Sequence, residues 1–338
     1  GSITNVDEVA PLVTAVSSTA ADGSYNAGDV IAITVSFDEA VFVSGTPQLT
    51  LNSGAVVNYS SGSGSSTLLF EYTVQPGDTS ADLQYISTTA LAGGTITDAA
   101  GNSAVLTLPA LADAASLAGG KAIVIDTTNP VFSSSGIATA IAENSGADQV
   151  VYNATADADT GVTYTLANSA DVSLFSIDAG TGAVTLTADP NYEAKASYLF
   201  TVVATDVAGN SSSQDVTLVI NNVDEVAPTI TSGTSGASVA ENSTGTVVYT
   251  VTASDTDSNL NGGIVYSLSG TDANNFSINA STGEVTQTVA FDYEAPKTGY
   301  SFTVVATDAA TNASTPLTVT GSITNVDEVA PLVTAVSS

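Results

Sequence analysis

The amino-acid sequence predicts an all-β fold, with three tandem Greek-key β-sandwich domains in an elongated array. The hydrophobic residues, 43% of the chain, are largely Val, Ile, Leu and Ala, and abundant Thr and Ser accompany them, a mixture that favours strands. Short alternating runs of these residues are separated by Gly, Asp, Asn and Pro. The 338 residues suffice for two or three domains that each bury a core. We therefore expect one immunoglobulin-like sandwich, followed by two sandwiches that are copies of each other.

A seven-residue acidic stretch, Asn-Val-Asp-Glu-Val-Ala-Pro, occurs at residues 5–11, 222–228 and 325–331. Its Pro disfavours a helix and favours an extended residue before it, so each copy is predicted to be a linker. Residues 1–18 recur unchanged at 321–338, a period of 320 residues, as expected of a tandem array. Residues 1–10 are therefore interpreted as the linker from a preceding repeat. Residues 325–338 are interpreted as a linker with the first strand of the next repeat.

The first predicted domain covers residues 11–127. Its alternating runs predict strands at residues 30–37, 48–51, 68–74, 95–97 and 122–125. Turn signals such as Asp22-Gly23 and Gly101-Asn102 separate them, which favours a sandwich of the immunoglobulin type. A second acidic segment that ends in Pro, residues 126–130, closes this domain.

The second and third predicted domains, residues 128–222 and 223–324, repeat one pattern. Ala142-Glu-Asn-Ser145 returns as Ala240-Glu-Asn-Ser243, and Phe200-Thr-Val-Val-Ala-Thr-Asp206 returns as Phe302-Thr-Val-Val-Ala-Thr-Asp308. Each copy offers about seven short strands with turns between them, which is typical of a sandwich.

The charge balance excludes whole classes of partner. The chain has 34 acidic residues against 3 Lys and no His, for a net charge of −31. Nucleic acid is excluded because phosphate contacts need basic residues, and anionic membrane surfaces are excluded for the same reason. No apolar run approaches the roughly 20 residues that a membrane helix needs, so we expect no membrane insertion. A solvating acidic coat is the alternative explanation of the charge, but it leaves the fixed positions of the carboxylates unexplained.

The missing residue types restrict the chemistry further. Without Cys, His, Met or Trp, there are no disulfides, and zinc, haem and iron–sulfur sites lose their imidazole and sulfur ligands. A bound metal must take oxygen ligands, which points to Ca²⁺. We do not expect an enzyme, since no Ser-His or Cys-His dyad can form. A carboxylate pair for glycoside hydrolysis is formally possible, but the carboxylates gather at domain ends rather than in a cleft.

The second and third domains resemble cadherin repeats. The early cadherin acid is matched by Glu143 and Glu241, and the Ala-x-Asp motif ends at Asp206 and Asp308. Further matches are Asp157 with Asp159, Asp255 with Asp257, and Asp292-Tyr-Glu294. The chain departs from the pattern at Asn222 and Asn325, which replace the first Asp of the linker, and at Asn191, which replaces the counterpart of Asp292. Each of these replacements removes a negative charge from the implied set of ligands.

The resemblance implies Ca²⁺ sites at the domain ends, whereas an isolated Asp more commonly serves as a turn residue. At the second junction the implied ligands are Glu143, Glu193, Asn222, Asp224, Glu225, Asp255, Asp257 and Asp308. At the first junction they are Asp126, Asp157, Asp159 and Asp206. At the C-terminal linker they are Glu241, Asp292, Glu294, Asn325, Asp327 and Glu328, and at the N-terminal linker they are Asp7 and Glu8.

The first domain resembles the immunoglobulin-like repeats of large bacterial surface adhesins, through phrases such as Asp98-Ala-Ala-Gly-Asn102. Together the resemblances imply a calcium-rigidified, monomeric extender of a giant type I-secreted (RTX-type) adhesin on the bacterial cell surface, active in cell adhesion or biofilm formation. Its partners would be the neighbouring repeats of the same chain, with carbohydrate or other cells bound by distal domains. The alternative is a binding module that grips polysaccharide or a copy of itself. The recurring tyrosines, such as Tyr152 and Tyr249, predict core packing rather than a sugar platform.

Overall fold

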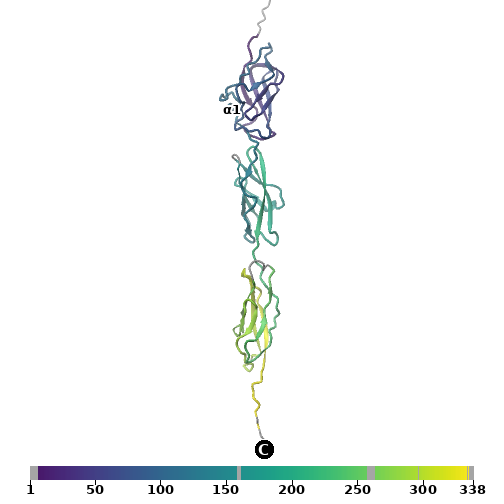
Figure 1. Cartoon of the computed structure of the whole chain (residues 1–338), viewed down its shortest axis with the longest axis vertical. Helices are drawn as coiled ribbons and strands as arrows, with labels where there is room; N and C mark the ends of the chain where they lie inside the picture. Colours follow the sequence, from purple (N-terminus) through teal and green to yellow (C-terminus); the bar gives the residue numbers. More distant parts are fainter. Residues whose placement is uncertain (1–6, 158–160, 257–262, 296, 333, 335–338) are drawn as a thin grey trace, which may run out of the picture. The chain divides into compact units, whose positions relative to one another are not determined.

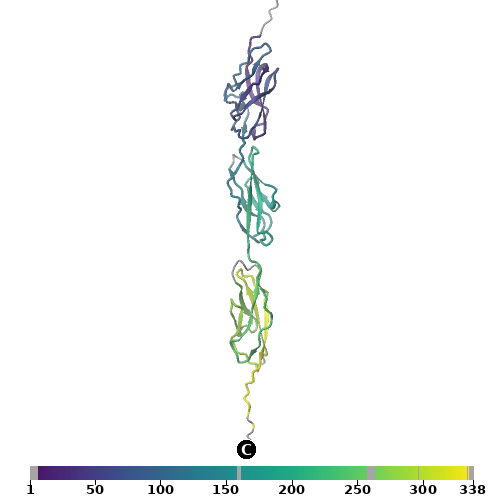
Figure 2. The same cartoon turned by 45° about the vertical axis from the view of Figure 1, so that its right-hand side comes forward.

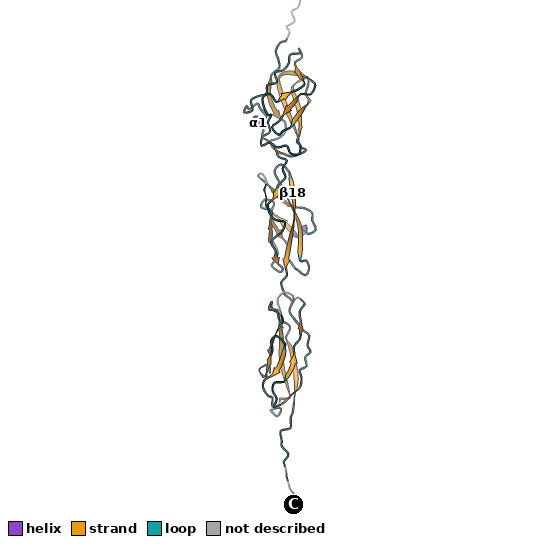
Figure 3. Cartoon of the chain, in the orientation of Figure 1, coloured by secondary structure: helices purple, strands orange, loops and turns teal. Residues whose placement is uncertain are grey.

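The fold is all-β, as predicted, and Figure 3 shows strands throughout the chain. The computed structural model describes residues 7–157, 161–256, 263–295, 297–332 and 334. Within these ranges the α-helical structure is the four-residue α1, Leu117–Gly120. None of the described helices has the length and apolarity needed to cross a membrane.

Two structural units divide the chain, Gly1–Asn221 and Asn222–Ser338. The first unit holds two separate hydrophobic cores, one within residues 16–125 and one within residues 138–220. The second unit holds a third core, within residues 239–323. Three tandem sandwiches therefore account for the chain, while the domain limits drawn from the sequence stay predictions.

The first core lies in a curled seven-stranded sheet with the order β1-β3-β6-β5-β4-β7, and β8 pairs with β3. A separate parallel pair joins β2 to β9. The strands are β1 (Val13–Ser18), β2 (Gly23–Tyr25), β3 (Val30–Ser44), β4 (Gln48–Thr50), β5 (Val56–Ser61), β6 (Ser65–Thr73), β7 (Leu91–Ala92), β8 (Thr95–Thr97) and β9 (Ile123–Ile125).

The strand β3 is longer than the run predicted at residues 30–37. Its pairing with β6 shifts register between Ser36 and Val41, and a bulge of this kind lets the strand continue past the acidic residues Asp38 and Glu39. Val41 is fully buried beyond the bulge, and the end of β3 pairs with β8. Glu39 lies within this irregular stretch of β3 and is half-buried.

The second and third cores share one topology, which confirms that their sequences are copies. A four-stranded sheet, β11-β18-β17-β14 or β20-β27-β26-β23, accompanies a three-stranded sheet, β12-β16-β15 or β21-β25-β24. A two-stranded pair, β10-β13 or β19-β22, completes each domain. The long partners β26 and β27 lie side by side in both views of the second unit (Figures 1 and 2).

The strands of the second core are β10 (Val131–Phe132), β11 (Ile141–Ala142), β12 (Gln149–Asn153), β13 (Ala156–Asp157), β14 (Thr163–Leu166), β15 (Phe175–Ile177), β16 (Ala183–Leu186), β17 (Ser197–Thr205) and β18 (Ser211–Asn221). Those of the third are β19 (Thr229–Ile230), β20 (Val239–Ala240), β21 (Val247–Thr250), β22 (Ala253–Ser254), β23 (Val265–Ser269), β24 (Phe276–Ile278), β25 (Glu284–Gln287), β26 (Gly299–Thr307) and β27 (Leu317–Thr324).

Aromatic side chains from both sheets fill these two cores. In the second core the ring of Phe200 lies 4.5 Å from that of Phe175 and 6.0 Å from that of Tyr152. Phe302 packs in the same way in the third core, where its ring lies 5.0 Å from Phe276 and 6.2 Å from Tyr249. Such tilted and edge-to-face pairs add to the free energy of burial. The packing of these aromatic side chains therefore stabilises each of the two sandwiches without a bound metal.

One lysine in each of the second and third domains forms an ion pair with an aspartate of the same domain. The Lys195 ammonium lies 2.6 Å from Asp171, which directly precedes a short 3₁₀-helix, η1 (Val172–Leu174). In the third domain Lys297 pairs with Asp272 ahead of η2 (Ala273–Asn275), at 2.5 Å. These ion pairs fasten the 3₁₀-helices to the segments that lead into the long strands β17 and β26.

Candidate metal centres

The N-terminal end of the third domain gathers three predicted ligands. Asp224 lies in the linker, Asp255 follows β22, and Asp308 follows β26. Each offers a carboxylate oxygen, and the three oxygens lie within 4.8 Å of one another. Asp224 and Asp308 are each only 6% exposed. Asp257, predicted for the same site, lies outside the described residues.

A tight loop orients Asp308. One carboxylate oxygen, Oδ1, accepts a hydrogen bond from the backbone N–H of Asn312 at 2.8 Å. The other, Oδ2, accepts one from the Asn312 side-chain amide at 3.0 Å. The same Asn312 amide nitrogen donates to the carbonyl oxygen of Asp224 at 3.0 Å, so two members of the cluster are held by one side chain.

The C-terminal end of the third domain gathers a second predicted set, Glu241, Asp292 and Glu294, again with oxygens within 4.8 Å of one another. Glu241 follows β20 and is 2% exposed. Its carboxylate accepts hydrogen bonds from the backbone N–H of Tyr293 at 2.6 Å and of Val326 at 2.7 Å. The linker that leaves the domain is thus tied to the buried carboxylate.

Side chains of this linker also meet the second set. The Asn325 amide donates to Glu294 Oε1 at 2.6 Å. Glu328 accepts a hydrogen bond from the Asn242 amide, and Asp327 accepts one from the N–H of Val329 in its own turn. Asn325 therefore contacts the predicted site, whereas Asp327 serves a local turn.

The pKa values of the two neighbouring glutamates, Glu241 and Glu294, are shifted in opposite directions. Backbone hydrogen bonds from Val326 and Tyr293 lower the pKa of Glu241. Burial, together with the nearby charges of Glu241 and Glu328, raises the pKa of Glu294. Desolvation is the largest cause and the neighbouring negative charges add to it, so a cation bound beside Glu294 would favour its ionised form.

The second domain has an equivalent buried glutamate, Glu143, at its C-terminal end. Glu143 is 2% exposed and accepts the N–H of Tyr192 at 2.8 Å, as Glu241 accepts that of Tyr293. Glu143 and Glu193 place carboxylate oxygens within 4.8 Å of each other. Asn191 stands where the third domain has Asp292, and it keeps only the turn hydrogen bond, from the N–H of Ala194 at 2.6 Å. The predicted ligands Asn222 and Glu225 belong to the linker that begins the second unit.

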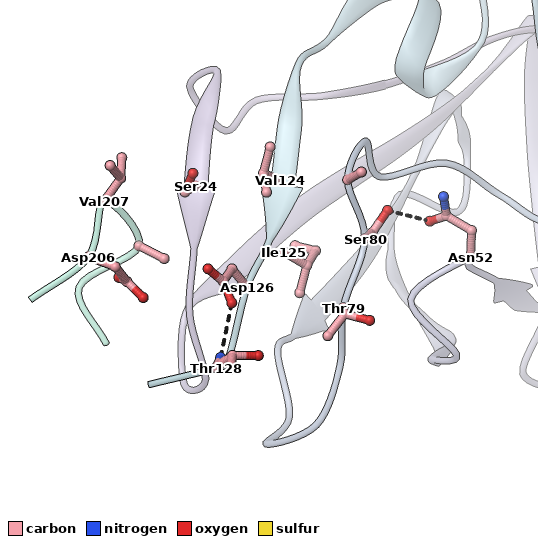
Figure 4. A pocket seen from close by; sticks show the side chains of 12 residues that line it. Ser24, Asn52, Thr79, Ser80, Val124, Ile125, Asp126, Thr128, Asp206 and Val207 are labelled. Atoms are coloured by element: carbon pink, nitrogen blue, oxygen red, sulfur yellow. Dashed lines mark hydrogen bonds between the residues drawn. The ribbon is translucent and has the colours of Figure 1, made fainter. Parts of the chain in front are cut away.

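The ligands predicted for the first junction are less tightly gathered. Asp126, Asp157 and Asp206 line one cavity of about 370 Å³. Asp126 and Asp206 also line a neighbouring cavity of about 700 Å³, shown in Figure 4, where Asp126 Oδ1 accepts the N–H of Thr128. Among the described residues these three carboxylates do not form a cluster with oxygens within 4.8 Å of one another. Asp159 lies outside the described residues.

A further cluster lies on the first domain, and sequence reasoning found only one of its members. Asp7, which was predicted, shares it with Glu39 and Asp98. Burial and the charges of Asp7 and Asp98 raise the pKa of Glu39. A signal for Asp98 was present, since Asp98-Ala-Ala-Gly-Asn102 repeats the pattern of Asp206-Val-Ala-Gly-Asn210. Glu8 joins none of the clusters formed by described residues.

The donor chemistry of these clusters fits a hard cation. Every donor is a carboxylate or amide oxygen, and nitrogen and sulfur ligands are absent because the chain has no His or Cys. Ca²⁺ takes six to eight such oxygens and tolerates irregular geometry. The clusters around Asp308 and Glu241 could supply several of these oxygens, with backbone carbonyls and water completing the shell.

Comparison with known proteins gives an independent view. Residues 235–324 match the cadherin domain family. The chain carries cadherin-like repeats. Mouse protocadherin-16 is 36% identical over 194 residues, and mouse protocadherin Fat 2 is 33% identical over 175 residues. These alignments cover 54% and 50% of the chain but only 6% and 4% of the relatives, so the chain spans about one-twentieth of their length.

A solved structure shows the same cadherin-like fold. The crystal structure of mouse cadherin-23 EC22-24 has a TM-score of 0.51 and 21% identity, and the match covers 94% of the chain and 99% of that structure. The predicted tandem β-sandwich fold is confirmed. The cadherin-domain homologues are adhesion proteins and not enzymes.

Proposed function

We propose that the chain is a calcium-rigidified extender of a large bacterial cell-surface adhesin, which projects distal binding domains for cell adhesion or biofilm formation. The observation that carries this proposal is the pair of carboxylate clusters at the two ends of the third domain, around Asp308 and around Glu241. Carboxylates at the ends of a sandwich are placed to act on the linkers rather than on a substrate in a cleft.

The residues of each cluster have distinct tasks. Asp308 and Glu241 are buried and oriented by hydrogen bonds before any ion arrives. Asp224 belongs to the linker itself, so its carboxylate connects that linker to the sandwich. A bound Ca²⁺ would supply the positive charge that offsets the repulsion between these groups. With that repulsion removed, the linker would be held more stiffly against its domain.

The repetition of the sequence supports an extender. The 18 residues at each end are identical, as expected when a protein needs many copies of a spacer and little variety. Neighbouring repeats of the same chain are then the direct partners, and carbohydrate or other cells would be bound by distal domains. The alternative is a module that binds polysaccharide or a copy of itself; its polysaccharide form is disfavoured because Tyr152, Tyr164 and Tyr249 are 6%, 7% and 9% exposed and cannot stack on a sugar.

Calorimetric titration of the chelator-stripped chain with CaCl₂ tests the proposal. We expect calcium to bind, and Asp308→Asn to remove one class of sites. Asp178→Asn is the matched control, because Asp178 accepts hydrogen bonds from its own turn, from the N–H of Gly180 and Thr181, and belongs to no cluster among the described residues. Absence of binding by the wild-type chain, or equal loss in both variants, would contradict the proposal.

A further inference from the structure

One five-residue loop recurs in all three domains, although the first has a different sandwich topology from the other two. It runs from Asp98 to Asn102, from Asp206 to Asn210 and from Asp308 to Asn312. In each loop the N–H of the Asp donates to the carbonyl of the Asn, at 3.1, 3.0 and 3.1 Å, which closes a hairpin. The loop is therefore a shared structural element and does not belong to one fold type.

Each loop pairs the carboxylate of the Asp with the amide of the Asn. The carboxylate accepts the backbone N–H of Asn102, Asn210 or Asn312 at 2.8, 2.9 and 2.8 Å. It also accepts the side-chain amide at 2.6, 3.0 and 3.0 Å. Hydrogen bonds to a charged acceptor are stronger than neutral ones, so the orientation of the Asn side chain is well fixed.

The fixed amide then contacts the linker that precedes its domain. A side-chain amide has two N–H donors, and in all three domains the amide nitrogen also donates to the backbone carbonyl of a linker Asp. The acceptors are Asp7 O at 2.9 Å, Asp126 O at 3.0 Å and Asp224 O at 3.0 Å. These contacts join residues that are 95, 84 and 88 positions apart in sequence.

In the third domain the contact lies next to the candidate metal centre. Asn312 binds the carboxylate of Asp308 and the carbonyl of Asp224, and both of those residues belong to one carboxylate cluster. Its neutral amide thus brings the linker Asp to the sandwich without adding charge. None of these hydrogen bonds requires a cation.

We propose that Asn102, Asn210 and Asn312 are positioning residues that fasten each preceding linker to its domain in the absence of metal. In the third domain Asn312 also sets the position of Asp224 for cation binding. The attachment of the linker to its domain is argued from the hydrogen bonds alone, and we call it the fastening. The effect on cation affinity rests on the proposed function. Calcium would then complete a linker geometry that the amide has already established.

A spin label on the linker tests the fastening. The chain has no Cys, and Val226 in the linker is 40% exposed, so Val226→Cys accepts a single nitroxide at a defined place. We expect a restricted electron paramagnetic resonance line shape in chelator and a clearly more mobile one after Asn312→Ala. Asn279→Ala is the control, since Asn279 also binds two backbone N–H groups, of Ser281 and Thr282, but lies in a distant turn.

A second variant, Asn312→Leu, keeps a side chain of similar size while removing both N–H donors and adding no charge, and it guards against a folding defect in the alanine variant. An equally mobile label in wild type and both Asn312 variants would overturn the fastening. Calcium titration of the same proteins then tests the second claim, with about tenfold weaker binding expected for Asn312→Ala. Unchanged affinity in that variant would overturn the positioning role, and no calcium binding in the wild type would overturn the proposed function while leaving the fastening in place.

Discussion

Glu294 and Glu241 place carboxylate oxygens within 4.8 Å of each other at the end of the third domain, yet their pKa values move in opposite directions. Glu241 is held ionised by two backbone N–H groups, whereas burial and neighbouring charges raise the pKa of Glu294. The pair is thus strained electrostatically as long as no cation lies between the two carboxylates.

This strain predicts a crossover in the stability of the Glu294→Gln variant. The raised pKa means that the folded state binds the Glu294 proton more tightly than the unfolded state, so in chelator this group destabilises the fold once the pH exceeds the usual Glu range. At neutral pH the variant should therefore melt at a higher temperature than wild type in chelator and at a lower temperature in calcium. Scanning calorimetry in both conditions is the measurement. Lower melting in both conditions would mean that the Asn325 hydrogen bond, and not repulsion, dominates at this position.

The ion pair of Asp171 and Lys195 predicts an acid-sensitive second domain. Burial opposes ionisation of Asp171, but hydrogen bonds from Lys195 and the N–H of Leu199 hold its pKa below the usual range. The stabilisation should be complete above the usual Asp pKa and be lost as the pH falls through the lower folded value. Asp171→Ala should cost about 2 kcal/mol at neutral pH.

Chemical denaturation at several pH values measures this cost. Because Lys297 and Asp272 form the same pair in the third domain, the unfolding transition of that domain serves as the internal control. A pH-independent loss in the variant would contradict the ionic origin of the stabilisation.

Thr311 predicts a stabilising substitution. It has φ of +77°, in the left-handed region, whereas Gly101 and Gly209 occupy the equivalent places in the other loops with φ of +95° and +90°. A β-branched residue is strained there, so Thr311→Gly should stabilise the third domain by about 1 kcal/mol. The converse change, Gly209→Thr, should destabilise the second domain by a similar amount. Thermal melts of both variants check this, and destabilisation by Thr311→Gly would show that the hydroxyl or methyl group contributes more than the backbone strain costs.

The sequence was a good guide to the features that repeat. The strand predicted at residues 95–97 coincides with β8, and the repeated Phe200 and Phe302 segments became the equivalent strands β17 and β26. The cluster of Asp7, Glu39 and Asp98 was only partly foreseen, because a β-bulge positions Glu39 and no alternation pattern marks it. The role of Asn312 was not visible either, since its partner is a backbone carbonyl, which has no signature in the sequence.

Removal of calcium should leave all three sandwiches folded. Their cores are made of buried apolar and aromatic residues, such as Phe70, Phe200 and Phe302, each with 0% exposure. We expect the far-ultraviolet circular dichroism spectrum to be unchanged by chelator at 25 °C. The melting temperature should fall, because an ion that binds only the folded state stabilises it by mass action. Loss of strand signal in chelator would show that the metal is needed for folding.

Calcium is expected to stiffen the connection between successive domains, and the distance distribution between two spin labels tests this most directly. Ser213 on β18 and Thr318 on β27 are exposed, lie in different units and can each be changed to Cys in this Cys-free chain. Pulsed electron paramagnetic resonance should give a narrow distance distribution in calcium and a markedly broader one in chelator. Asp308→Asn should broaden the distribution in calcium, and Asp178→Asn should not. Equal widths with and without calcium in the wild-type chain would contradict the account.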